Sequence, residues 1–104
     1  MSGGLEELVS VTIQYRASIL FPELVVKNVD TGKIYLRDDS VTSSNETLNL
    51  RVPAGTSLKV EVTDGLINVL QMFPPWTNIV QITDQVIIVD IADQEVFVEI
   101  EITR

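Results

Sequence analysis

The chain of 104 residues contains neither cysteine nor histidine. It therefore has no disulfide, no thiolate nucleophile, no zinc finger and no imidazole base, which excludes most familiar catalytic sites. Basic residues are few as well, because 7 Lys and Arg stand against 15 Asp and Glu, for a net charge of −8. That sign opposes binding to the phosphates of nucleic acid and to anionic membrane surfaces, so we expect neither as a partner.

Long hydrophobic runs are also absent. The longest, Val86 to Val89, is far shorter than the roughly 18 residues that a membrane-spanning helix requires. Near the N-terminus, Glu6 and Glu7 place acid where a secretory signal needs positive charge. We therefore expect no membrane insertion and no signal peptide in this chain. The compartment stays open: virion or cytoplasm, or the extracellular space if a signal has been removed.

Val and Ile alternate with polar residues in segment after segment, which is the pattern of half-buried strands. Over residues 8–15, for example, Val9, Val11, Ile13 and Tyr15 fall on one face, which we expect to point inward. About seven to nine short strands at this spacing predict an all-β, two-sheet sandwich of immunoglobulin-like or transthyretin-like type. We expect residues 1–7 to form a flexible leader and residues 8–104 a single domain.

No alternating helical segments supply parallel crossovers, so the sheets should be mainly antiparallel. Residues 24–29 and 33–37 flank Asp-Thr-Gly and predict a hairpin, and residues 48–52 and 58–62 flank Pro-Ala-Gly-Thr and predict a second one. The last third of the chain predicts a meander of three strands over residues 78–83, 86–92 and 96–103.

Two segments are less regular. Residues 66–73 suit either a strand or one short helix, because Leu66, Val69, Leu70 and Phe73 follow helical spacing. Residues 38–46 are polar and without period, which favours an exposed loop or a poorly paired edge.

Turn sequences between residues 24 and 65 resemble those of a known group of sandwiches. The chain has Thr31-Gly32-Lys33 before one strand, Val52-Pro53-Ala54-Gly55 at the end of another, and Asp64-Gly65 after the next. This pattern resembles the transthyretin-like sandwiches, which include carboxypeptidase-regulatory-like and Cna-B-like modules. The resemblance implies a non-catalytic scaffold domain of extracellular or assembly type.

Apolar residues exceed what one sandwich core needs. Residues 66–73 and 86–89 carry them on both strand faces, although a two-layer sandwich buries only one. Either loops cover the surplus or it faces a neighbouring subunit, since large apolar patches seldom stay exposed in monomers. We predict a non-enzymatic, self-associating subunit of a virion, tail, pilus-like or surface assembly, partnered by itself or by other structural subunits. The candidate interface residues are Met72, Phe73, Trp76, Ile87 and Phe97.

Trp76 admits three interpretations. After Pro74-Pro75 it could be a rigid interface anchor, a core residue, or a stacking platform for a sugar. The third interpretation supports the alternative function, a carbohydrate- or peptide-binding module with its site on the loops at one end of the sandwich.

Carboxylates provide the remaining candidates. Glu99 and Glu101 share a strand face roughly 7 Å apart, a spacing that inverting glycosidases use, but alternating Glu on a strand is normally a solvated face. We therefore predict no catalytic residues. We also expect no cofactor and no metal; if calcium binds, Asp38 and Asp39 are the first candidate ligands, although Asp in turns usually hydrogen-bonds its own backbone.

Overall fold

A computed structural model describes residues 7–17, 23–38, 45–63, 65–73 and 79–103. These residues form nine strands and no helix, so none of them belongs to a helix long and apolar enough to cross a membrane. The strands are β1 (Leu8–Ala17), β2 (Leu24–Asn28), β3 (Ile34–Asp38), β4 (Asn45–Pro53), β5 (Ser57–Val62), β6 (Leu66–Phe73), β7 (Ile79–Ile82), β8 (Val86–Asp90) and β9 (Val96–Thr103).

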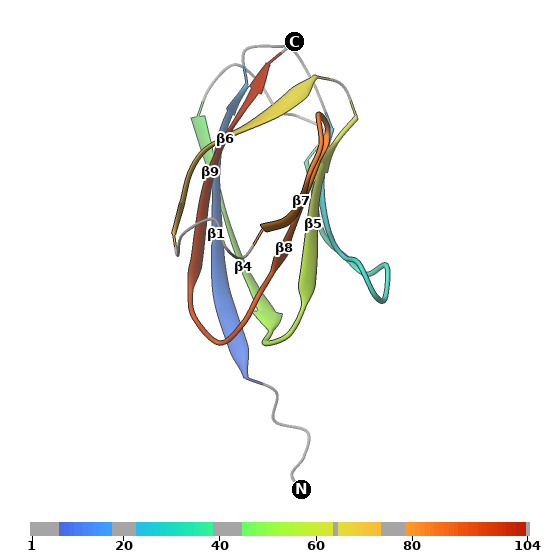
Figure 1. Ribbon diagram of the computed structural model, residues 1–104, viewed down its shortest axis with the longest axis vertical. Coiled ribbons are helices and arrows are strands. Elements are labelled where there is room, and N and C mark those ends of the chain that lie inside the picture. Colours follow the sequence, from blue (N-terminus) through green and yellow to red (C-terminus); the bar gives the residue numbers. More distant parts are fainter. Residues whose placement is uncertain (1–6, 18–22, 39–44, 64, 74–78, 104) are drawn as a thin grey trace, which may run out of the picture.

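The strands form two sheets that face each other as layers (Figure 1). One has four strands in the order β4-β1-β9-β6, and the other has five in the order β3-β2-β5-β8-β7. Every pairing is antiparallel except that of β1 with β9, which is parallel. The predicted all-β, mainly antiparallel two-sheet sandwich is therefore confirmed.

Alternating side chains build one core between the sheets. The predicted inward face of β1 is confirmed, because Val11, Ile13 and Tyr15 are each 1% exposed. Strand β9 alternates in the same way and buries every second residue from Val96 to Ile102. Strands β2, β5 and β8 supply the facing side chains. Each fully buried aliphatic side chain contributes about 1.5–3 kcal/mol to folding.

The predicted hairpin over residues 24–37 is confirmed, since β2 pairs antiparallel with β3. Its turn closes with the Gly32 amide donating to the Asn28 carbonyl at 2.9 Å. Gly32 has a φ of 77°, a conformation that glycine adopts without steric cost.

The predicted hairpin of residues 48–52 with 58–62 is wrong. Strand β4 pairs with β1 in one sheet, whereas β5 pairs with β2 and β8 in the other. The intervening turn therefore carries the chain from sheet to sheet, with the Gly55 amide donating to the Ile91 carbonyl at 2.7 Å. Alternation shows which side chains are buried but not which strand lies alongside, so a corner between sheets looks like a hairpin.

One of the two pairings in the predicted three-strand meander is correct; the other is wrong because alternation does not show which strands are neighbours. Strand β7 pairs with β8, but β8 and β9 lie in different sheets.

Residues 66–73 form strand β6, so the helical alternative is wrong. A bulge between Val69 and Gln71 interrupts the period of two there, which explains the apparent helical spacing. In the polar segment of residues 38–46, Asp38 ends β3 and β4 begins at Asn45, while residues 39–44 lie outside the described chain.

Candidate functional site

The described sandwich has two edges of different character. A buried hydroxyl, that of Tyr15, hydrogen-bonds to Asp38 of β3 and to Glu46 of β4, so these two edge strands lie on the same side. The other two edge strands, β6 and β7, lie on the opposite side. There the Ile67 amide of β6 donates to the Asp84 carbonyl, in the turn between β7 and β8, at 2.7 Å.

Strands β6 and β7 carry no charge, and together we call them the uncharged edge. The sequence from Leu66 to Thr83 contains no Asp, Glu, Lys or Arg. The opposite edge strands carry Arg37 and Asp38 in β3, and Glu46 and Arg51 in β4. Natural proteins protect the open backbone of edge strands with such charges, because an unprotected edge pairs with other strands. The uncharged edge lacks this protection by charge; a bulge interrupts each of its two strands instead.

Exposed apolar side chains gather on the same edge. Eight large hydrophobic side chains are exposed in the described part of the chain, and five of them belong to β6 or β7. The most exposed is Phe73, at 60%. It lies directly opposite Phe97, which is half-buried on the neighbouring strand β9. The other four are Leu66, Leu70, Val80 and Ile82.

The structure separates the five interface candidates predicted from the sequence. Phe73 and Phe97 form the cross-strand aromatic pair beside the uncharged edge. Met72 and Ile87 point into the core, with exposures of 7% and 0%. Trp76 lies outside the described residues. Among the described members of this set, only Phe73 and Phe97 are exposed enough to contact a partner.

The protected side of the sandwich is held together by Tyr15. Its ring is 1% exposed, and its hydroxyl contacts Asp38 and, at 2.5 Å, Glu46, which share its single hydrogen. Burial, reinforced by the two carboxylates, raises the pKa of Tyr15 well above its usual value, so the phenol keeps its proton. This cluster ties β3 of one sheet to β1 and β4 of the other and closes that side.

The alternation of residues 8–15 predicts that Tyr15 is buried but does not predict this cluster. The partners lie 23 and 31 positions away along the chain, and no local motif connects them. Asp38, one of the two first candidates in the event that calcium binds, contacts the Tyr15 hydroxyl, while Asp39 lies outside the described residues. No group of three or more carboxylates that could hold a metal is present in the described ranges.

The paired carboxylates of β9 lie on the outer face of the four-stranded sheet. Glu99 and Glu101 are half-buried there, and Glu101 lies 3.6 Å from the Arg16 guanidinium of neighbouring β1. One of the two carboxylates is therefore engaged in an ion pair.

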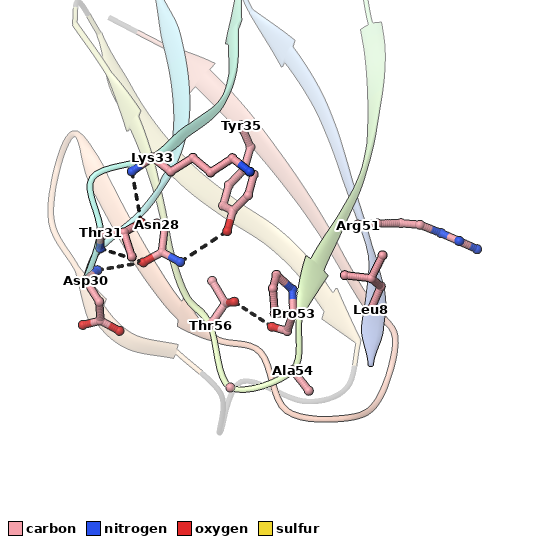
Figure 2. A pocket seen from close by; sticks show the side chains of 11 residues that line it. Leu8, Asn28, Asp30, Thr31, Lys33, Tyr35, Arg51, Pro53, Ala54 and Thr56 are labelled. Carbon is pink, nitrogen blue, oxygen red and sulfur yellow. Dashed lines mark hydrogen bonds between the residues drawn. The ribbon is translucent and has the colours of Figure 1, made fainter. Parts of the chain in front are cut away.

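An open groove of about 780 Å³ lies between the β2–β3 turn and the β4–β5 turn (Figure 2). The Asn28 side chain organises one wall. Its Oδ1 accepts from the backbone amides of Asp30 and Thr31, and its Nδ2 donates to the Tyr35 hydroxyl at 3.2 Å. The Lys33 ammonium lies 5.4 Å from the centre of the Tyr35 ring. Arg51 also lines the groove, but its side chain projects away from this cluster.

Comparison with known proteins gives no relative: no family model, no curated protein and no solved structure matches this chain.

Proposed function

We propose that this chain is a non-enzymatic structural subunit that associates with copies of itself through the uncharged edge. A larger assembly of virion, tail, pilus-like or surface type would be built from such contacts. The observation that carries the proposal is that β6 and β7 lack any charge, while five of the eight exposed large hydrophobic side chains lie on them.

An unprotected edge gains backbone partners and apolar burial from association. A strand added to β6 would satisfy its open backbone groups and cover Phe73 and Leu70, and a strand added to β7 would do the same for Val80. The opposite edge offers less, because its charged side chains would lose hydration on contact. The described surface thus has one edge suited to association and one edge protected against it.

A charge introduced at the centre of the contact tests this proposal. We expect Phe73→Lys to weaken association at least tenfold, because each dimer would bury two ammonium groups against an apolar edge. Val80→Lys repeats the test on β7, where the side chain is 57% exposed. Light scattering during gel filtration measures the mass, and circular dichroism checks that each variant is folded.

Ile34→Lys is the matched control, since Ile34 is 46% exposed on β3, the protected edge. Each substitution changes the net charge from −8 to −7, so a difference between the variants depends on position and not on overall charge. If Phe73→Lys and Val80→Lys associate as the unmodified chain does, the proposal is wrong.

A second candidate function, binding of a carbohydrate or peptide, is favoured by the groove in Figure 2. Among the described residues, the Tyr35 hydroxyl accepts from Asn28 and donates to no protein acceptor, and Lys33 makes no ion pair. Glycan and peptide arrays test this function, with binding expected to disappear in Tyr35→Ala. Absence of binding on both arrays removes it.

A further inference from the structure

Of the two strands in the uncharged edge, β6 offers the longer backbone to a partner. It has eight residues, whereas β7 has four. The Ile67 amide is already bonded to Asp84. Since amides alternate sides along a strand, the next one on the free side is that of Val69. A bulge between Val69 and Gln71 interrupts this alternation, and the strand ends at Phe73. The stretch open to a partner therefore runs from Val69 to Phe73 and contains the bulge, with Gln71 at its middle.

We infer that two copies of this chain pair β6 against β6, antiparallel, about a twofold axis near Gln71. The inference rests on the proposed function and specifies its contact. A twofold contact uses the same patch on both copies, and identical strands related by such an axis run antiparallel. The pairing joins the two four-stranded sheets into one continuous sheet and brings the exposed Phe73 of each copy into the contact.

Charge makes a second copy a suitable occupant of this edge. Two molecules of charge −8 repel, so their contact must keep carboxylates apart. Asp84 contacts β6 through its carbonyl at Ile67, four residues from Gln71, so eight residue rises, or about 27 Å, would separate it from its copy. On the outer face of the sheet, the carboxylates next to β6 are Glu99 and Glu101 of β9. Across the paired edges, β9 lies three strand spacings from its copy, or about 14 Å. This exceeds the Debye length of about 8 Å at physiological ionic strength, so the repulsion is largely screened.

Pairing through the opposite edge would bring charged side chains into the contact. Its edge strands carry Arg37, Asp38, Glu46 and Arg51, and a second copy one strand spacing away, about 4.8 Å, would remove water from them. The uncharged edge is thus the side on which two copies can approach without burying charge.

The absence of cysteine from the chain allows a clean test, because one introduced cysteine is the only thiol present. Opposed residues of antiparallel strands have Cα atoms about 4.5–5.5 Å apart, within the range of roughly 4.4–6.8 Å that a disulfide spans. Gln71→Cys, near the axis, should therefore form a disulfide dimer under mild oxidation. Asn68→Cys is the control on the same strand, since six residue rises place it on the order of 20 Å from its copy.

The mass of the unmodified chain, measured alongside, separates the two proposals. A dimer with disulfide formation in Gln71→Cys but not in Asn68→Cys supports the β6 pairing. A dimer without disulfide in Gln71→Cys, or with equal disulfide formation at both positions, overturns the β6 pairing and leaves the proposed function standing. A chain that stays monomeric overturns both.

Discussion

The Tyr15 cluster allows a quantitative prediction about stability. Tyr15→Phe keeps the buried ring but removes the hydroxyl whose single hydrogen is shared by Asp38 and Glu46. Hydrogen bonds to charged groups contribute about 1.5–3 kcal/mol, and two half-buried carboxylates would lose their common donor. We expect the free energy of unfolding at pH 7 to fall by about that amount. For a domain of this size the melting temperature would drop by roughly 6–24 °C.

The pH dependence of stability provides a second readout. Because the pKa of Tyr15 is raised in the folded state, the unfolded chain releases the phenolic proton first, near its usual value of about 10. The stabilisation from this group is therefore complete below pH 10 and is lost as pH rises further. Above pH 10 the free energy of unfolding should fall with a slope that approaches about 1.4 kcal/mol per pH unit.

Urea unfolding at pH 7, 9, 10 and 11 measures both effects. Compared with the unmodified chain, Tyr15→Phe should be less stable at pH 7 and should lose less stability above pH 10. Tyr35→Phe is the matched control, because Tyr35 is half-buried beside the groove and its hydroxyl contacts Asn28. Equal stability of Tyr15→Phe and the unmodified chain at pH 7, or parallel losses above pH 10, would refute the assigned role.

Three further predictions concern salt, a turn and the core. Raising NaCl from about 0.05 to 0.5 M should lower the dissociation constant of the dimer, because screening weakens repulsion between copies of charge −8. Sedimentation measures this constant, and a rise with salt would mean that ion pairs drive association. Gly55→Ala should lower the free energy of unfolding in urea by about 1–2 kcal/mol. The φ of Gly55 is 88° and no atom lies within 4 Å of the added Cβ, so the loss would come from backbone strain and not from a clash; a loss near zero would contradict this. Ile87→Ala, at 0% exposure, should cost about 2–5 kcal/mol, whereas Ile34→Ala, at 46%, should cost about 0.5 kcal/mol or less; similar losses refute the assigned core.

Much of the fold was predictable because buried and exposed positions of a strand alternate in the local sequence. The alternation of β1 identified its inward face, and the Asp-Thr-Gly turn identified the pairing of β2 with β3. The pairing partners of β4 and β9 were not predictable in this way. Both lie next to β1 through contacts distant in sequence, and one of these pairings is parallel.

The candidate site was partly predictable. Phe73 was identified from apolar residues in excess of one core, but its place on an edge strand depends on strand order, which alternation does not encode. A stronger signal was present in the sequence, namely the absence of charge from Leu66 to Thr83. This uncharged segment can be interpreted as an edge only when the strand order is known, because it contains both edge strands of one side, β6 and β7.

The mass of the unmodified chain in solution decides whether the chain associates with copies of itself. Sedimentation equilibrium over micromolar to millimolar concentrations should show a dimer of twice 11.6 kDa, or a larger assembly, that becomes more populated with concentration. A mass of 11.6 kDa throughout would contradict association through the uncharged edge.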